Sequence, residues 1–403
     1  MRGLSASEQG AIERAAAEPM LEQVQAWAAV NSGSRNLDGL AKMAGIYADA
    51  FAALPGDISL ADAAPVDAMG ADGSLRPVAH GRNLHLRVRA EAPVQLLLTG
   101  HMDTVFGADH PFQQVSWRVE NVLGGPGVAD MKGGIAIMLA ALKAVEASPA
   151  AGRLGYEVVI NSDEEVGSPG SAALIAQAAR GKRAALTYEP AALPDGTLAG
   201  ARPGSGNFSI HVAGRSAHAG RNPEEGRNAL VAAADLALRL DRAKGAGLKI
   251  NPARIDGGGP NNVVPDHAVL RVNLRPDTPE DEARARALLE ETIATVAAAH
   301  DVCIHLHGGF GRPPKPLDPE AEKLFSLVKR CGVDLGQDIS WRATGGVCDG
   351  NNIAACGVPV VDTMGVRGGA IHSADEYLIV ESLGERAALS ALTMLRLAEG
   401  DEL

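Results

Sequence analysis

The chain has 403 residues, of which 46% are hydrophobic, 21% are charged and only 3% are aromatic. This composition is typical of a globular protein with a core of small aliphatic side chains, and the length favours two domains. The formal net charge of −12 argues against nucleic acid or an anionic membrane surface as a partner.

The chain carries no obvious targeting signal. Its first segment has no apolar stretch and includes Glu8, Glu13 and Glu18, so it does not resemble a secretory signal. No apolar run approaches the roughly 18 residues of a membrane-spanning helix. The cysteines show no CxxC spacing and predict no disulfide framework. We therefore expect a cytoplasmic protein that does not act on membranes.

In the first half of the chain, helical patterns alternate with apolar strands. Apolar spacing predicts helices at residues 18–30, 37–54 and 131–147, the last of them largely buried. An alternating segment predicts a strand at 82–90, and short apolar runs predict buried strands at 94–100, 156–162 and 184–189. This alternation indicates an α/β sheet, whose functional groups gather beyond the carboxyl ends of its strands.

The pattern changes after residue 201. Strand, helix, two strands, helix and strand are predicted at 208–214, 223–243, 248–258, 267–277, 278–299 and 301–309. This β-α-β-β-α-β order is that of the ferredoxin-like fold. The α/β pattern then resumes with helices from residues 319 and 381 and a strand at 358–365. We therefore predict a mixed, mainly parallel α/β domain of residues 1–202 and 314–403, with a ferredoxin-like α+β domain of residues 203–313 inserted into it.

Polar residues suited to metal binding follow the predicted strand ends. They are His101, Asp103, Asp130, Glu164, Glu165, Glu189 and His372. The segment INSDEEVG (160–167) ends a buried strand with three consecutive carboxylates, which repel one another unless a cation neutralises them. Zinc takes histidine nitrogen and carboxylate oxygen, whereas Mg²⁺ and Ca²⁺ prefer oxygen alone. The pattern therefore favours Zn²⁺, with Co²⁺ or Mn²⁺ as possible substitutes.

Each residue alone also has a simpler interpretation, such as a solvated acidic loop, a helix cap for Asp130 or a turn for Glu189. Two other enzyme classes fit less well. The segment GRSAH (214–218) lacks the final glycine of a serine-hydrolase elbow. The segment GGPGVAD (124–130) does not match the dinucleotide-binding pattern and follows a poor strand candidate.

Several spaced motifs resemble those of one known family. They are GHMDTV (100–105), GVADMKGG (127–134), SDEEVGS (162–168), YEP (188–190), SAHAG (216–220) and IHSADE (371–376). The chain in this respect resembles the di-zinc metallopeptidases and deacylases that include glutamate carboxypeptidase, acetylornithine deacetylase, succinyl-diaminopimelate desuccinylase and aminoacylase. The glutamate carboxypeptidase branch is the most similar, and the predicted insertion falls where the family carries its lid and dimerisation domain.

The resemblance implies a role for each motif residue. Two Zn²⁺ ions would be held by His101 with Glu189 and by Glu165 with His372, and Asp130 would bridge them. Asp103 would orient the imidazole of His101, and Glu164 would be the general base. The peptide bond between Asp130 and Met131 is often cis in the family.

The resemblance also assigns roles in the inserted domain. His218, supplied by the other subunit, would stabilise the oxyanion, which implies a homodimer formed through residues 203–313. Asn262, Arg275 and Arg312 match positions that line the substrate site. The two arginines could clamp a substrate carboxylate bidentately, although Arg312 could equally be a solvated strand-end residue.

One segment departs from the family pattern. Many relatives have Gly-Gly-Thr-Asp before the last ligand, whereas here Val347 and Cys348 precede Asp349. Cys348 is better interpreted as a pocket or packing residue than as a nucleophile. We expect hydrolysis of an amide bond in a small N-acyl amino acid or dipeptide with a free carboxylate, by either a carboxypeptidase or a deacylase. The alternative from another class is a metal-free binding or scaffold protein.

Overall fold

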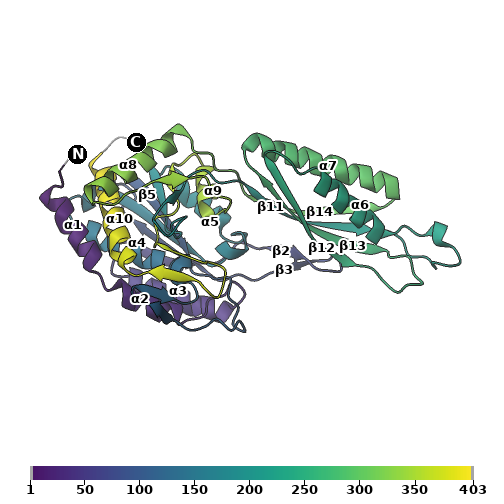
Figure 1. Ribbon diagram of the computed structural model, residues 1–403, viewed down its shortest axis with the longest axis horizontal. Helices are drawn as coiled ribbons and strands as arrows, with labels where there is room; N and C mark the ends of the chain where they lie inside the picture. Colours follow the sequence, from purple (N-terminus) through teal and green to yellow (C-terminus); the bar gives the residue numbers. More distant parts are fainter. Residues whose placement is uncertain (1–2, 401–403) are drawn as a thin grey trace.

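The computed structural model describes residues 3–400, which form an α/β body and an elongated second unit projecting from it (Figure 1). The helices of the body are α1 (Ala6–Ala17), α2 (Met20–Ala28), α3 (Leu37–Phe51), α4 (Gly133–Glu146), α5 (Ala172–Ala179), α8 (Pro319–Asp334), α9 (Asp349–Ala354) and α10 (Glu381–Glu399). The body therefore uses both ends of the chain, as the sequence pattern predicts for an insertion.

The centre of the body is a six-stranded sheet in the order β1-β4-β8-β5-β9-β16. These strands are β1 (Asp57–Ala61), β4 (Asn83–Val88), β8 (Leu154–Asn161), β5 (Val94–His101), β9 (Ala184–Thr187) and β16 (Val360–Val361). The last four strands of this order pair in parallel, and β4 is antiparallel to both of its neighbours. The predicted mixed, mainly parallel sheet is confirmed, and its parallel strands end at one edge.

Short strands complete the body around that edge. A second sheet has the order β17-β18-β7-β6, and β10 pairs with β15. Their bounds are β17 (Gly368–Gly369), β18 (Tyr377–Ile379), β7 (Val122–Gly124), β6 (Ser116–Val119), β10 (Leu198–Ala199) and β15 (Trp341–Arg342).

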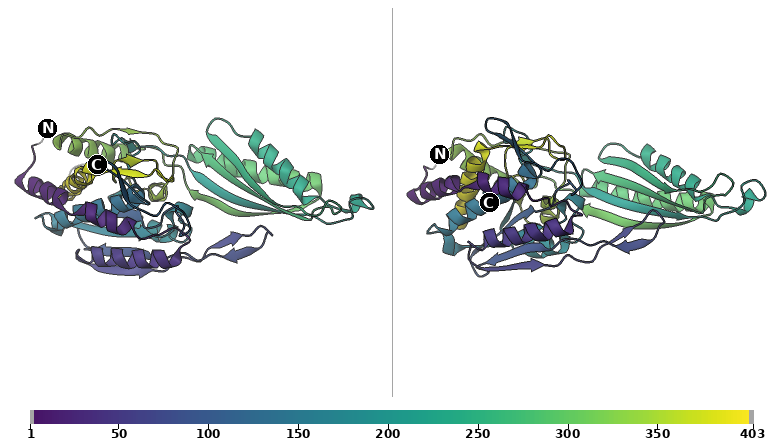
Figure 2. Two further views of the ribbon diagram at one scale, coloured as in Figure 1. Left: turned by 60° about the horizontal axis from the view of Figure 1, so that its bottom comes forward. Right: turned by 90° about the horizontal axis from the view of Figure 1, so that it is seen from below.

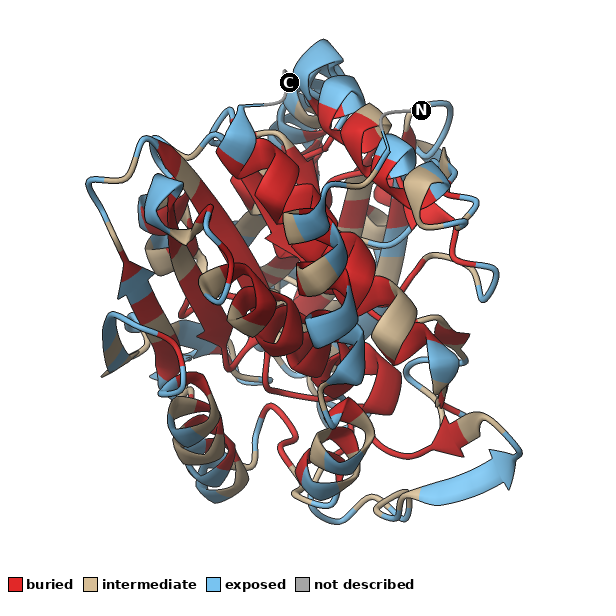
Figure 3. Cartoon of the chain, turned by 90° about the vertical axis from the view of Figure 1, so that its left-hand side faces the viewer, coloured by how far each residue is buried: buried red, intermediate tan, exposed pale blue. Residues whose placement is uncertain are grey.

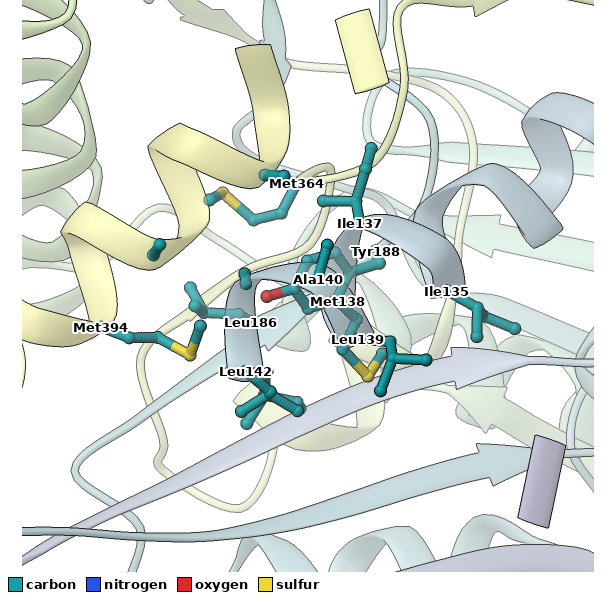
Figure 4. Close-up of a cluster of buried hydrophobic side chains, with 14 of the residues drawn as sticks. Ile135, Ile137, Met138, Leu139, Ala140, Leu142, Leu186, Tyr188, Met364 and Met394 are labelled. Carbon is teal, nitrogen blue, oxygen red and sulfur yellow. The ribbon is translucent and has the colours of Figure 1, made fainter. Parts of the chain in front are cut away.

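The core of the body lies between the sheet and the helices packed on it (Figure 3). Most side chains of α4 are buried on every side, in line with its apolar sequence, and α10 packs against it. Figure 4 shows side chains of α4 beside Leu186, Tyr188, Met364 and Met394. A Cβ atom at Gly134 would lie 2.0 Å from the carbonyl oxygen of Tyr188, so glycine allows the start of α4 to approach the end of β9.

The second unit is an antiparallel sheet with two helices on one face (Figure 1). Its elements are β11 (Ser205–Ala213), α6 (Ala229–Arg242), β12 (Leu248–Gly257), β13 (His267–Pro276), α7 (Pro279–His300) and β14 (Cys303–Arg312). The strand order β12-β13-β11-β14 is that of a ferredoxin-like sheet. Residues such as Phe208, Leu248 and Val272 pack under the helices, whereas alternate residues form a polar open face.

A short hairpin from the body reaches the second unit (Figure 2). It consists of β2 (Asp67–Met69) and β3 (Leu75–Pro77). Arg271 of β13 donates from Nη2 to the carbonyl oxygen of Met69 at 2.7 Å, and His307 of β14 donates from Nε2 to that of Asp67 at 3.0 Å. The hairpin therefore ties the two units together outside their covalent connections.

Several element boundaries differ from the sequence prediction. Helix α1 was not predicted, yet it buries Ala11 and Ala15 and pairs Glu8 with Arg396 of α10. The predicted helix 131–147 begins at Gly133, because the π-helical turn Val128–Lys132 contains Asp130 and Met131 with non-helical backbone angles. The predicted helix 223–243 begins at Ala229, after the Asn228 cap, and the strand predicted at 358–365 extends only from Val360 to Val361.

Within residues 3–400, no helix is both long and apolar enough to cross a membrane.

Candidate metal centre and active site

Five side chains from distant parts of the chain converge at the edge where the parallel strands end. His101 ends β5, Glu165 follows β8, and Glu189 follows β9. Loops supply Asp130, in the turn before α4, and His372, between β17 and β18. All five are the metal ligands predicted from the sequence motifs.

Asp130 lies between the two histidines. Its Oδ1 atom lies 3.1 Å from Nε2 of His101, and its Oδ2 atom lies 3.3 Å from Nε2 of His372. His372 Nε2 also lies 3.1 Å from Oε2 of Glu165, and His101 Nε2 lies 3.8 Å from Oε2 of Glu189. The side chains thus form two groups that share one carboxylate.

The donor set fits divalent transition metals. Ligand atoms of His101, Asp130 and Glu165 lie within 4.8 Å of one another, and so do those of His101, Glu164 and Glu189. Imidazole nitrogen with carboxylate oxygen is the mixture that zinc takes in catalytic sites. The side chain of His372 is 53% exposed, so the group is open to solvent on one side, as a catalytic metal site must be.

Buried negative charge is the main electrostatic feature of the site. Burial raises the pKa of Glu165 to about 7 and the pKa of Glu189 to about 8, against the lowering effect of the histidines. Hydrogen bonds with Asp130 and Glu165 raise the pKa of His372 to about 11. These carboxylates are therefore costly to ionise together, and bound cations would offset their charge.

Asp103 acts differently from the sequence expectation. The imidazole Nδ1 of His101 donates to the backbone carbonyl of Asp103 at 2.9 Å, and the carboxylate lies farther away at 3.4 Å. That carboxylate accepts the N–H groups of Glu164 and Glu165 at 3.1 and 3.2 Å, and the hydroxyl of Ser34 at 2.7 Å. Asp103 therefore orients His101 through its backbone and the two glutamates through its side chain.

Glu376, which no predicted role covers, holds the Asp130 loop. It is buried, and its carboxylate accepts N–H groups from Gly127, Ala129 and Asp130 at 3.0–3.1 Å. The peptide bond between Asp130 and Met131 is cis. The sequence does contain a signal for Glu376. It ends the IHSADE motif and lies four residues after His372, a predicted metal ligand.

Arg312 lies in a buried network of acidic and polar side chains. Its side chain is 4% exposed and forms ion pairs with Asp349 and with Glu164, the latter between Nη2 and Oε1 at 2.7 Å. It also donates to Oδ1 of Asn352 and to the hydroxyl of Ser168. Its terminal nitrogens Nη1 and Nη2 are therefore engaged by neighbouring side chains, and the substrate clamp expected of this residue stays a prediction.

Arg275 lines a cleft between the two units. The cleft encloses about 1000 Å³ and extends from Glu164, Glu165 and His372 to the open face of the second sheet. Arg275 donates from Nη1 to the backbone carbonyl of Gly345 at 3.1 Å, so it contacts the glycine loop of the body. We call this space the interdomain cleft.

His218 and Asn262 lie together but away from the predicted ligands. Both are exposed, His218 pairs with Val263 in a β-bridge, and the N–H of Ala219 donates to the carbonyl oxygen of Asn262. Neither residue is among those that line the interdomain cleft. A single chain therefore does not bring these two predicted substrate-binding residues to the metal centre.

A smaller cavity of about 220 Å³ adjoins the predicted ligands. Its lining includes Asp130, Glu189 and His372, and also Val347 and Cys348. Cys348 is buried, and burial raises the pKa of its thiol well above the usual value. This agrees with its interpretation as a pocket residue, because a protonated thiol is a poor nucleophile.

Comparisons with known proteins identify the family of the chain. The model of Peptidase family M20/M25/M40 matches residues 97–396. The chain belongs to this family. It is 32% identical over 330 residues to carboxypeptidase G2 of Pseudomonas sp. (strain RS-16), covering 79% of this chain and 78% of that protein. It is 27% identical over 333 residues to a succinyl-diaminopimelate desuccinylase of Psychrobacter arcticus, covering 76% and 79%.

Solved structures share the whole fold. The aminopeptidase PepT of Bacillus cereus has a TM-score of 0.70 at 23% identity, with 96% of this chain and 99% of that chain covered. With the family membership, these relatives identify the chain as a metal-dependent hydrolase of peptide or other amide bonds.

Proposed function

We propose that the chain is a two-metal amide hydrolase that cleaves a small N-acyl amino acid or dipeptide with a free carboxylate. The observation that carries this proposal is the position of Asp130, whose two carboxylate oxygens face His101 and His372 separately. One ion would be held by His101 and Glu189, the other by Glu165 and His372, and both by Asp130. Zn²⁺ suits these donors best, and Co²⁺ or Mn²⁺ would substitute for it.

The bound ions would polarise the amide carbonyl and make water a stronger nucleophile. Glu164 would be the group that moves protons, since its carboxylate lies beside His101 and Glu189. Its Oε1 atom accepts from Arg312, which leaves Oε2 to take the proton of the attacking water. The same carboxylate would deliver that proton to the leaving nitrogen, as one acid–base group commonly does in both steps.

We propose a homodimer through residues 203–313, because His218 and Asn262 are exposed and a partner subunit could bring them to the active site. We propose a cytoplasmic location, since all four cysteines are free thiols.

The test is a hydrolysis screen on metal-loaded protein, using N-acetyl, N-succinyl, folate-type and dipeptide substrates. The proposal predicts cleavage of at least one class, loss of activity with a chelator, and its return with Zn²⁺ or Co²⁺. Cleavage of N-succinyl substrates alone would favour a desuccinylase over a carboxypeptidase. Substrate or product binding without any cleavage would favour the metal-free binding or scaffold alternative.

A further inference from the structure

Two cations lie opposite each other on the open face of the second sheet. Lys249 on β12 and Arg275 on β13 are register partners in the antiparallel pair. Like charges directly opposite each other destabilise a sheet unless something neutralises them. Alternation along a strand sends neighbouring residues to the other face, and Leu248 and Leu274 do pack in the core under the helices.

Both cations line the interdomain cleft. The acidic residues that line the cleft, within the described part of the chain, are Glu164 and Glu165 at the metal centre. No ion pair involving Lys249 or Arg275 is present among residues 3–400. Lys249 is exposed and makes no hydrogen bond there, so its charge is available to a ligand.

Arg275 is held in place while part of its guanidinium stays free. It donates from Nε to Oδ1 of Asn273 at 2.9 Å and from Nη1 to the carbonyl of Gly345 at 3.1 Å. The next residues of that loop, Gly346 and Val347, line both the interdomain cleft and the smaller cavity at the predicted metal ligands. The cation pair is therefore linked through one short loop to the predicted reaction centre.

We propose that Lys249 and Arg275 together bind a carboxylate of the substrate, and that Lys249 is a specificity-determining residue of the active site. This inference rests on the proposed function and deepens it. The pair takes the place of the Arg275 and Arg312 clamp, because Arg312 is occupied by Glu164 and Asp349. A lysine acts as a point charge beside the planar arginine fork, so the site would accept a carboxylate from one end of the substrate without demanding one geometry.

The experiment compares three substrates built on one uncharged amino acid. The N-acetyl amino acid carries a carboxylate at the amino-acid end, the N-succinyl amino-acid carboxamide carries one at the acyl end, and the N-acetyl amino-acid carboxamide carries none. Lys249→Gln should lower kcat/KM by about tenfold or more, mainly through KM, for whichever carboxylate substrate the wild type prefers. It should affect the neutral carboxamide much less, and Lys249→Arg should restore most of the loss.

The control variant is Lys244→Gln, which removes one exposed lysine charge of the same unit at a residue outside the cleft lining. Equal losses on charged and neutral substrates, or no loss on either, would overturn the inference. So would an equal loss in the control, because the effect would then come from overall charge. The carboxylate substrate whose kcat/KM falls in Lys249→Gln identifies the end of the substrate that the pair binds.

A binding measurement separates this inference from the proposed function. The same three compounds are titrated into metal-loaded Glu164→Gln protein, with and without Lys249→Gln. If Lys249→Gln raises the Kd of the carboxylate compounds alone, the result supports the cation pair even when no compound is cleaved. Unchanged Kd values would contradict it. Absence of cleavage by the wild type with normal binding would sink the proposed function and not this inference.

Discussion

Glu164 and Arg312 form a buried ion pair beside the predicted metal ligands, with Oε1 and Nη2 2.7 Å apart. Burial raises the pKa of Glu164 to about 8, and the guanidinium opposes that effect. The arginine that family motifs assign to the substrate is therefore paired with Glu164, the proposed general base. Asp349, its other partner, accepts further hydrogen bonds from Asn161 and Ser168, so the pair is part of a connected polar network.

Arg312→Gln should lower both stability and turnover. Removing one partner of a buried ion pair costs about 3–5 kcal/mol, because the remaining charge is left unpaired. Denaturant unfolding should show that the free energy of unfolding falls by this amount, and kcat should fall for charged and neutral substrates alike. A higher KM for carboxylate substrates with unchanged stability would instead indicate that Arg312 binds substrate.

Glu164→Gln should abolish most turnover while the protein keeps its metals. General acid–base groups contribute about 10²–10⁴-fold to rate, and glutamine cannot take the proton. The measurement is kcat together with metal content by mass spectrometry. Activity within a few fold of the wild type would show that another group is the base, and loss of metal would show that Glu164 is a ligand.

Glu376→Gln should weaken metal binding without unfolding the protein. The carboxylate accepts hydrogen bonds from three N–H groups of the Asp130 loop. In glutamine the amide nitrogen would face at least one of these N–H groups and could not accept its hydrogen bond. Residues that orient metal ligands typically change affinity by about 10–100-fold. Competition with a zinc chelator measures this, and Asp375→Gln, which alters the adjacent acid, is the control. Unchanged affinity would mean that the loop holds its shape without Glu376.

The stability contributed by Glu8 should depend on pH. Burial alone would raise its pKa, but the N–H of Ser5 and the guanidinium of Arg396 lower it below the ordinary value of 4.5. A lowered pKa means that the contribution is present above pH 4.5 and is lost as the pH falls through the lowered value. The difference in Tm between wild type and Glu8→Gln should therefore be largest near neutral pH and should shrink in acid.

The matched variant for this test is Glu13→Gln, which changes an exposed glutamate on the same helix. It should shift Tm little at any pH. A Tm difference for Glu8→Gln that stays constant from pH 7 to pH 3 would contradict the role of the ion pair with Arg396.

The sequence predicts the fold class well because its signals are local. Apolar runs mark β5, β8 and β9, and the polar residues at their ends meet because parallel strands share an edge. Helix α1 lies outside the predicted elements because its buried face has one large aliphatic residue, Ile12, beside Glu8, Ala11 and Ala15. Its apolar periodicity is therefore weak. The β2–β3 hairpin lies outside any motif, and its contacts with Arg271 and His307 join residues far apart in the chain.

The local sequence does not show which residues a side chain contacts in the folded chain. Arg312 sits in a motif position that suggests substrate binding, and only the packed structure reveals that Glu164 and Asp349 occupy its donors. Lys249 lies in no motif, and only its register with Arg275 across two strands indicates a role in substrate binding. Such relationships depend on strand pairing and burial, which residue spacing alone does not give.

The metal content of the purified chain, measured by mass spectrometry beside amide hydrolysis, tests the two-metal centre most directly. The shared position of Asp130 between His101 and His372 predicts two divalent ions per chain. It also predicts activity that a chelator removes and that Zn²⁺ or Co²⁺ restores. One ion per chain at full activity would contradict the bridging role of Asp130, and no ion with no restored activity would contradict the metal centre itself.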